Sequence, residues 1–354
     1  VGINMNISVI GTGSFGTSLS MVLNDNNNRV MMYGRNQDTV LEINQSHTNS
    51  QYLKNIDLAS DIKATSSLKE AVSHGEVLVL AVPVNAMRSV AAEINQLLKD
   101  LSKEVLIVHV AKGLELNTYK RVSEVLEEVF DPEYVSDICV LSGPSHAEEV
   151  AEKQPTTVST ASIHSKGAEI IQDVFMTDYF RVYVNNDMVG VEIGGALKNI
   201  VALAVGALSG YGFGDNPKAA VITRGLHEIA RLGTKLGANP LTFLGLAGMG
   251  DLIVTATSQH SRNYRCGQML AGGLSLEEAT EKMGMVVEGV NTTRATYELA
   301  EKYDVDMPIT KVLYGYLFND ISEDEAFSAL MKREKTSESE GLKQLLESQI
   351  KNSK

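Results

Sequence analysis

The chain of 354 residues is long enough for two domains, because single domains commonly span about 100–150 residues. Hydrophobic residues make up 44% of the sequence and charged residues 21%, which excludes wholesale disorder, collagen-like repeats and coiled coils. The 44 acidic residues outnumber the 31 basic residues and give a net charge of -13. We therefore expect no nucleic-acid partner and no attraction to an anionic membrane.

The two cysteines and the chain start bear on location and metals. Cys139 and Cys266 lie neither in a CxxC pair nor beside a histidine at metal-ligand spacing, so we expect no disulfide framework and no metal. The chain opens without a signal-peptide pattern, which predicts a cytoplasmic protein. The most apolar region, Ile193–Leu208, contains Lys198 and Asn199, so we expect a helix buried in protein and no membrane insertion.

In the first half, short β-branched runs alternate with longer amphipathic stretches. This alternation is typical of βαβ units and predicts an α/β domain with a mostly parallel sheet. The expected strands are Asn6–Ile10, Arg29–Tyr33, Val77–Val82, Val105–Val110, Ile138–Leu141, Thr156–Thr160 and Phe180–Val184.

From Asp187 onward the apolar residues follow helical spacing with almost no strand signal. We expect the α/β domain over residues 1–188 and an all-helical C-terminal domain over 189–331. Residues 332–354 are mostly Lys, Glu, Ser and Gln, which predicts a frayed helix or a disordered polar tail. The expected helices are Val189–Ser209, Pro217–Leu236, Leu241–Thr257, Ser275–Met283, Val290–Tyr303 and Pro308–Phe318.

A glycine-rich GxGxxG loop follows the first expected strand and opens a helical stretch. Gly11 permits the tight turn, Gly13 lets backbone approach a pyrophosphate, and Gly16 allows close helix–strand packing. The helix N-terminus adds amide groups and a positive dipole. This context favours a Rossmann-type dinucleotide site over a flexible glycine turn.

The end of the second expected strand bears on cofactor choice. NAD-specific sites usually place Asp or Glu there, about 20 residues beyond the loop, on the ribose 2′-hydroxyl. Here the strand is followed by Gly34-Arg35-Asn36. Arg35 can pair with a 2′-phosphate or stack on the adenine, so we expect NADP(H) to bind at least as well as NAD(H). The alternative is a solvated surface arginine.

Two lysines are candidates for proton transfer. Lys112 follows the expected strand Val105–Val110, and open α/β sheets place ligands at the carboxyl ends of their strands. Lys198 lies among small and apolar residues, and lysines without a partner are rarely buried. Burial and a neighbouring cation both lower a lysine pKa toward the range useful for proton transfer. Alternatively, Lys198 ties off helix carbonyls or pairs with a buried carboxylate such as Glu192.

A polar cluster near residue 255 suits a phosphorylated ligand. Asp251 and Thr255 are four residues apart and would share one helix face. Arg262, between Ser261 and Asn263, offers a planar fork and short polar donors suited to a phosphate dianion. The alternative is an ordinary helix end with Asp251 as its N-cap.

Together these motifs resemble bacterial NAD(P)-dependent glycerol-3-phosphate dehydrogenase, from Ile7 to about Met331. The resemblance implies reversible NAD(P)H-dependent reduction of dihydroxyacetone phosphate to sn-glycerol 3-phosphate, which supplies glycerophospholipid synthesis. By analogy with the helical domains of such dehydrogenases, it also suggests a homodimer. The segments that carry it are Gly11–Gly16, Ala81–Pro83, Ala111–Glu115, Leu141–Ala147, Val191–Asn199 and Gly248–Asn263.

The resemblance also implies residue roles. Lys198 matches the family's proton-transferring lysine; we expect Lys112 to stabilise the alkoxide and Asp251 to orient Lys198. Ser145 stands where many members have Thr, and it keeps the hydroxyl. The implied substrate contacts are Lys112, Gly143, Ser145, Lys198, Asp251, Ser261, Arg262 and Asn263. The implied cofactor contacts are Ser14, Phe15, Arg35, Lys112, Ala147, Arg262, Val286 and Glu288, beside Gly11, Gly13 and Gly16.

Two other functions fit parts of the sequence. One is a dehydrogenase of the same architecture that acts on a β-hydroxy acid or a sugar acid; Lys112, Lys198 and Arg262 together suit a small phosphate better. The other is a non-catalytic NADP(H)-binding sensor, against which the intact Lys112, Lys198 and Asp251 argue.

Overall fold

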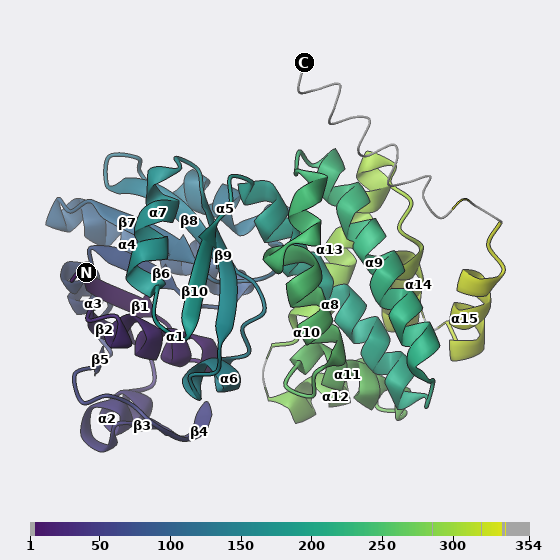
Figure 1. Cartoon of the computed structure of the whole chain (residues 1–354), viewed down its shortest axis with the longest axis horizontal. Helices are drawn as coiled ribbons and strands as arrows, with labels where there is room; N and C mark the ends of the chain where they lie inside the picture. The colour runs from purple at the N-terminus through teal and green to yellow at the C-terminus, as the bar shows by residue number, and fades with distance from the viewer. Residues whose placement is uncertain (1–3, 285, 320, 335–336, 338–354) are drawn as a thin grey trace. The chain divides into compact units, whose positions relative to one another are not determined.

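The computed structural model divides into two compact units, shown in Figure 1. The first contains the described residues before Lys112 together with Lys120–Met188, and the second contains Lys112–Tyr119 together with the described residues from Val189 onward. The segment Lys112–Tyr119 thus packs with the second unit, although the sequence-based division at residue 188 placed it in the first. The expected tail lies mostly outside the described residues, which are 4–284, 286–319, 321–334 and 337.

The first unit is built on an eight-stranded sheet with strand order β10-β9-β8-β7-β6-β1-β2-β5. Neighbouring strands are parallel except β8 and β9, which pair antiparallel. The sheet strands are β1 (Asn6–Ile10), β2 (Arg29–Tyr33), β5 (Lys63–Thr65), β6 (Val77–Leu80), β7 (Val105–His109), β8 (Val135–Ser142), β9 (Thr156–Ser162) and β10 (Phe180–Val184). A separate antiparallel pair, which the sequence did not predict, joins β3 (Thr48–Asn49) to β4 (Leu53–Asp57).

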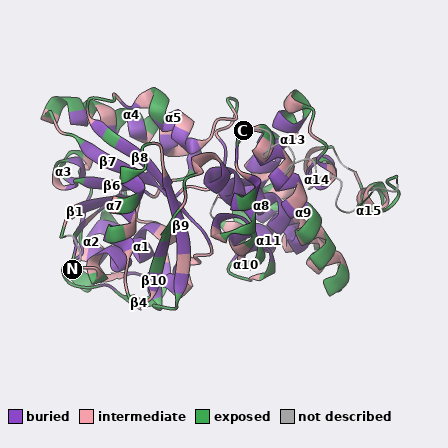
Figure 2. Cartoon of the chain, turned by 45° about the horizontal axis from the view of Figure 1, so that its top comes forward, coloured by how far each residue is buried: buried purple, intermediate pink, exposed green. Residues whose placement is uncertain are grey.

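Helices cover both faces of this sheet, so its central strands are buried nearly throughout (Figure 2). Alternate side chains of β6 enter different cores: Val77 and Val79 join one hydrophobic cluster, whereas Leu78 and Leu80 join the other. The helices of this unit are α1 (Ser14–Asp25), α2 (Gln37–Ser46), α3 (Leu68–His74), α4 (Val84–Leu101), α5 (Val122–Val129), α6 (Ala147–Ala151) and α7 (Lys166–Phe175).

Apart from Lys112–Tyr119 and the loops between helices, the described residues of the second unit form helices. Its core surrounds α8 (Met188–Gly210), most of whose residues are buried. The sequence-predicted fold class, a mostly parallel Rossmann-type domain followed by a helical region, is therefore confirmed. The other helices are α9 (Asp215–Lys235), η1 (Pro240–Leu244), η2 (Leu246–Gly250), α10 (Asp251–Thr257), α11 (Arg262–Ala271), α12 (Leu276–Met283), α13 (Glu288–Tyr303), α14 (Pro308–Phe318) and α15 (Glu323–Met331).

The prediction of a single helix over Leu241–Thr257 is wrong. The structure has a 3-10 turn (η1), a π-helical turn (η2) and the short helix α10 in its place. Gly245 interrupts the first two with an extended backbone, and a Cβ on Gly248 would overlap the backbone of Phe243. Glycine here permits a fold-back that a continuous helix would not make.

Helix α8 has the length and composition of a membrane span, with a mean hydropathy of 1.6 over its most apolar window. Of that window, 83% is buried inside the protein. A helix that protein encloses on all sides is apolar all round, so the composition of α8 is that of a buried core helix.

Candidate active site

A buried ion-pair cluster lies in the second unit, where side chains from three segments meet. The carboxylate of Asp251, at the start of α10, accepts hydrogen bonds from Lys112 and Lys198. Its Oδ2 atom lies 2.7 Å from Lys112 Nζ, and its Oδ1 atom contacts Lys198 Nζ. Lys198 Nζ also donates to Thr255 Oγ1 at 2.7 Å. Lys198 and Asp251 are buried, whereas the Lys112 side chain keeps 18% of its surface exposed.

Burial and the neighbouring charges set the protonation of this cluster. Burial lowers the pKa of Lys198 to about 7; the Asp251 carboxylate opposes this shift and the Lys112 cation adds to it. Burial would raise the pKa of Asp251, but the two lysines hold it below its usual range. Lys198 can therefore gain and lose a proton near neutral pH beside a carboxylate that stays ionised.

Local helix geometry supports the cluster. Asp251 and Thr255 share one face of α10, as their spacing predicted, and Thr255 Oγ1 lies 3.3 Å from Asp251 Oδ1. The partner of Lys198 is thus a carboxylate on another helix. Asp251 lies where the π-helical turn η2 continues directly into α10, so its own backbone is helical on both sides.

A chain of carboxamide hydrogen bonds runs beside the ion pairs. Asn199 Nδ2 donates to the backbone carbonyl of Lys112 at 3.3 Å, and Asn199 Oδ1 accepts from Asn263 Nδ2 at 2.9 Å. Asn263 Oδ1 in turn accepts from the Gly289 amide at 2.8 Å. These bonds fix the start of α11 and the start of α13 relative to Lys112.

The expected phosphate contacts lie at the N-terminus of α11. Ser261 is buried and caps the helix, because its Oγ accepts the Tyr264 amide at 3.2 Å. Arg262 is exposed at the first helical position, and its Nη1 lies 3.4 Å from the Val286 carbonyl. Glu288 begins α13 two residues beyond Val286. The first turn of α11 thus presents amide groups and a guanidinium, a combination that binds anions.

The glycine-rich loop of the first unit joins β1 to α1. Gly11 has a φ of +126°, and a Cβ there would lie 2.5 Å from the Ala81 carbonyl oxygen. A Cβ on Gly16 would overlap the Gly11 carbonyl, whereas one on Gly13 would meet no described atom within 4 Å beyond its own neighbours. Gly11 thus forms the tight turn, Gly16 allows the close packing and Gly13 leaves an open backbone face, as the GxGxxG pattern predicted.

Neighbouring side chains hold this loop. Ser14 Oγ donates to the Tyr52 carbonyl at 3.0 Å, and Phe15 packs against the hydrophobic core. Asn49 Nδ2 donates to the Thr12 carbonyl at 2.8 Å. Arg35 is exposed just beyond the carboxyl end of β2.

Three more expected site residues follow β8 in the first unit. Gly143 has a φ of +148°, and a Cβ there would lie 2.9 Å from Val158 Cα, so no other residue fits without a shift. Ser145 Oγ donates to the Gly143 carbonyl at 2.9 Å. Ala147 is buried at the first position of α6. The predicted site residues thus form two groups, one within each unit.

Comparison with known families covers both halves of the chain. The model of the NAD-dependent glycerol-3-phosphate dehydrogenase N-terminus matches residues 6–168, and that of the C-terminus matches residues 187–328. The chain belongs to the NAD-dependent glycerol-3-phosphate dehydrogenase family. The resemblance drawn from the sequence is confirmed.

Individual members of the glycerol-3-phosphate dehydrogenase family are similar over nearly their whole length. The glycerol-3-phosphate dehydrogenase (NAD(P)+) of Macrococcus caseolyticus is 56% identical over 334 residues, which cover 94% of this chain and 100% of that one. The protein of the same name from Bacillus velezensis is 52% identical over 345 residues, covering 98% and 99%. The crystal structure of glycerol-3-phosphate dehydrogenase from Coxiella burnetii superposes with a TM-score of 0.87 at 34% identity, covering 93% and 99%.

Asn199 contacts the ion-pair cluster, and sequence reasoning did not single it out as a site residue. It is buried next to Lys198 and contacts both Lys112 and Asn263. A carboxamide in the middle of an apolar helix was the available signal, because a buried amide needs hydrogen-bond partners.

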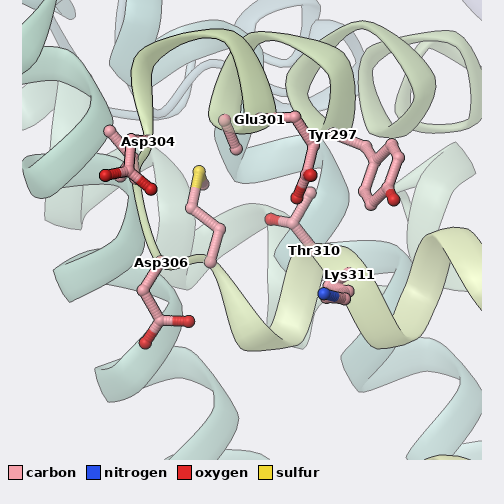
Figure 3. A pocket seen from close by; sticks show the side chains of 9 residues that line it. Tyr297, Glu301, Asp304, Asp306, Thr310 and Lys311 are labelled. Carbon is pink, nitrogen blue, oxygen red and sulfur yellow. The ribbon is translucent and has the colours of Figure 1, made fainter.

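A pocket of about 270 Å³ between α13 and α14 lies apart from these residues. Figure 3 shows the carboxylates of Glu301, Asp304 and Asp306 in it, beside Thr310 and Lys311. Among the residues that the structure describes, no group of three or more His, Cys, Asp or Glu side chains is placed to hold a metal ion.

Proposed function

We propose that this chain catalyses the reversible NAD(P)H-dependent reduction of dihydroxyacetone phosphate to sn-glycerol 3-phosphate. The observation that carries the proposal is the buried Lys198–Asp251–Lys112 cluster, in a chain whose two halves both match the glycerol-3-phosphate dehydrogenase family. A buried amine with a pKa near neutrality suits reversible proton transfer to a small ketone.

Lys198 is the proton donor in the reducing direction and the acceptor in the oxidising direction. Its Nζ is held by Asp251 and Thr255, so the acid has one orientation before the ketone arrives. Lys112, partly exposed and paired with the same carboxylate, stabilises the negative charge that develops on the ketone oxygen. Asp251 orients Lys198 and keeps the two cations together.

The substrate phosphate binds at the N-terminus of α11. Arg262 supplies a guanidinium there, and Asn263 and the capped helix start at Ser261 fix its surroundings. The phosphate lies away from the reacting carbon, and the free energy of its binding orients that carbon for reaction. Gly143 and Ser145 are further substrate contacts by their family positions.

The first unit binds the nicotinamide cofactor, which supplies the hydride when bound. The residues present fit such a group, because the open backbone face at Gly13 and the N-terminus of α1 form a cradle that a side chain would fill. Ser14, Phe15 and Ala147 of the first unit are cofactor contacts by their family positions. Val286 and Glu288, which belong to the second unit, are further cofactor contacts on the same ground.

Arg35 gives NADP(H) an advantage over NAD(H). It follows β2 at the place where an acidic residue would select the ribose 2′-hydroxyl, and its exposed guanidinium suits a 2′-phosphate. The proposed reaction needs no metal, because Lys112 and Lys198 provide the positive charge.

The setting of the enzyme is also part of the proposal. It acts in the cytoplasm without membrane insertion, forms a homodimer and supplies sn-glycerol 3-phosphate to glycerophospholipid synthesis. The net charge of -13 supports the absence of a nucleic-acid partner. Sedimentation of the purified chain tests the dimer.

The loss of nicotinamide absorbance tests the activity directly. Purified protein is mixed with dihydroxyacetone phosphate and either NADPH or NADH, with Lys198→Ala in parallel. Turnover in the wild type that is lost in the variant supports the reaction. The ratio of the rates with NADPH and NADH tests the proposed role of Arg35. NADPH binding without turnover on this substrate refutes the proposal. A panel of β-hydroxy acids and sugar acids then distinguishes the two alternatives, because another dehydrogenase turns over one of them and a non-catalytic sensor turns over none.

A further inference from the structure

The β3–β4 hairpin lies outside the main sheet, beside α2 (Figure 1). Within this hairpin the polar residue Asn49 is 0% exposed, whereas its chain neighbours Thr48 and Ser50 are not buried. The eight-stranded sheet forms without the hairpin. The burial of a carboxamide in it therefore calls for an explanation.

The Asn49 amide is directed at the glycine-rich loop. Its Nδ2 atom donates to the Thr12 carbonyl and to Thr17 Oγ1, both at 2.8 Å. Thr17, in the first turn of α1, also donates its hydroxyl to the Thr12 carbonyl at 3.4 Å. Among the described residues, Asn49 Oδ1 has no hydrogen-bond partner. A buried acceptor without a partner is unfavourable, so the side chain contributes through its two N–H donors, and the loop receives both.

Contacts on both sides of Asn49 fix the position of its carboxamide. Glu42 of α2 accepts Thr48 Oγ1 at 2.8 Å and the Ser50 amide at 2.7 Å. Leu53, which pairs with Asn49 across the hairpin, is buried in the core of the first unit. The hairpin thus holds the donor group from outside the loop.

Asn49 orients the peptide group between Thr12 and Gly13. In a trans peptide the C=O and N–H bonds point in opposite directions, so the Gly13 N–H points away from Asn49. Because glycine is conformationally permissive, this peptide can turn over at little cost. The turned peptide would place a carbonyl oxygen where the N–H now points, and that oxygen would repel a pyrophosphate.

We propose that Asn49 is a positioning residue for the cofactor, because it holds the Thr12–Gly13 peptide with its N–H available to the pyrophosphate. The inference rests on the proposed binding of a nicotinamide cofactor at this loop. Asn49 acts through the peptide that it orients. Its loss therefore weakens cofactor binding and leaves the chemical step intact.

The first test is Asn49→Ala, which removes both donors together with the unpartnered acceptor. We expect the Kd and the KM for NADPH to rise about 3- to 30-fold, the effect of one to two lost hydrogen bonds. At saturating NADPH, kcat and the KM for dihydroxyacetone phosphate stay within about twofold of wild type. NADPH fluorescence titration and initial rates measure these quantities.

Thr17→Val is a milder second variant, which keeps the shape of a buried side chain and removes its hydroxyl. We expect it to raise the Kd for NADPH about 2- to 10-fold, and its effect to be less than additive with that of Asn49→Ala. Wild-type NADPH affinity in either folded variant overturns the role of Asn49. A fall in kcat with unchanged NADPH affinity overturns it as well.

Asn28→Ala is the matched control. Asn28 is 3% exposed, and its Nδ2 also donates to two backbone carbonyls, those of Leu23 and Val174, both at 3.0 Å. It precedes β2, whereas the glycine-rich loop follows the parallel strand β1, so the two amides lie at opposite edges of the sheet. We expect Asn28→Ala to lower the melting temperature and keep wild-type NADPH affinity. An equal loss of affinity in this control would assign the effect of Asn49→Ala to general destabilisation.

Hydrogen exchange in the cofactor-free protein separates this role from the proposed activity. The Gly11 amide donates to the Tyr33 carbonyl and the Thr17 amide to the Gly13 carbonyl, both at 2.9 Å, so the two amides report the order of the loop. Their exchange rises several-fold in Asn49→Ala and stays at the wild-type rate in Asn28→Ala. Wild-type rates in both variants overturn the positioning role. Wild-type protein that binds neither NADPH nor NADH refutes the proposed cofactor site, and the exchange still decides whether Asn49 orders the loop.

Discussion

The backbone of Gly194 in α8 packs so closely against the carbonyl of Ala247 in η2 that a Cβ on Gly194 would overlap that oxygen. Lys198 follows Gly194 by one helical turn, and Asp251 follows Ala247 by the same four residues. The close approach of the two backbones therefore brings the ammonium and the carboxylate into contact. The ion pair between Lys198 and Asp251 therefore depends on the lack of a side chain at Gly194.

Gly194→Ala tests this dependence. The added methyl group forces α8 and η2 apart, so we expect a loss of about 1–3 kcal/mol in the free energy of unfolding and a fall in kcat. Thermal melting and ketone reduction measure the two effects. Gly214→Ala is the control, because its φ is -74° and an added Cβ would meet no described atom within 4 Å beyond its own neighbours. A Gly194→Ala variant with wild-type stability would show that the two segments can separate freely.

Sequence reasoning reached Lys198 because a charge in an apolar helix is a local conflict, and Lys112 because it lies at a strand end. It reached Asp251 through its four-residue spacing from Thr255. The carboxamide hydrogen bonds of Asn199 were not predicted, because the bond between Asn199 and Asn263 joins residues 64 positions apart. Only the folded packing brings such amides together.

The same distinction holds for the elements. The strands β1, β2 and β10 were predicted to the residue, because short runs rich in apolar residues mark them. The edge strand β5 has three residues and little apolar pattern, so its pairing with β2 was not predicted. Helix α11 was missed because its sequence begins with a polar cluster, although Ser261 carried an N-cap signal.

Lys198→Ala should abolish the proton transfer while leaving cofactor binding intact. Removal of a positioned acid usually costs about 10²–10⁴ in rate, or roughly 3–5 kcal/mol of transition-state stabilisation. Stopped-flow reduction kinetics and NADPH fluorescence titration measure the two quantities separately. Near-normal turnover in the variant would remove Lys198 from the mechanism.

Arg262→Ala should weaken binding of the phosphorylated substrate. The lost charge-assisted contact is worth about 1.5–3 kcal/mol, so we expect KM for dihydroxyacetone phosphate to rise roughly 10- to 100-fold. Comparison of glycerol 3-phosphate with glycerol in the oxidising direction isolates the phosphate. Unchanged discrimination between these two substrates would exclude Arg262 as the phosphate ligand.

The two directions of the reaction should respond oppositely to pH. The pKa of Lys198 is about 7, and ketone reduction needs its ammonium form, so reduction slows as pH rises through about 7. Alcohol oxidation needs the neutral amine and accelerates over the same range. Initial rates at saturating substrates between pH 5.5 and 9 in both directions check this. Parallel profiles in the two directions would mean that another group controls the rate.

Glu228 in α9 should make stability depend on pH. Its buried carboxylate accepts the amides of Ile309 and Thr310, at 2.6 and 3.1 Å, and thereby caps α14. Burial raises the pKa of Glu228 to about 7 despite these hydrogen bonds. The folded chain thus binds this proton more tightly than the unfolded chain. The resulting stabilisation is complete below pH 4.5 and is lost as pH rises toward 7.

Glu228→Gln removes this titration, so the fall in unfolding free energy between pH 5 and pH 8 should shrink by about 2–3 kcal/mol relative to wild type. Urea unfolding at the two pH values measures the difference. Glu278→Gln is the control, because the exposed Glu278 caps α12 and its pKa is lowered, which leaves it ionised at both pH values. The same pH dependence in Glu228→Gln as in wild type would mean that Glu228 stays ionised in the folded chain and caps α14 as a carboxylate throughout.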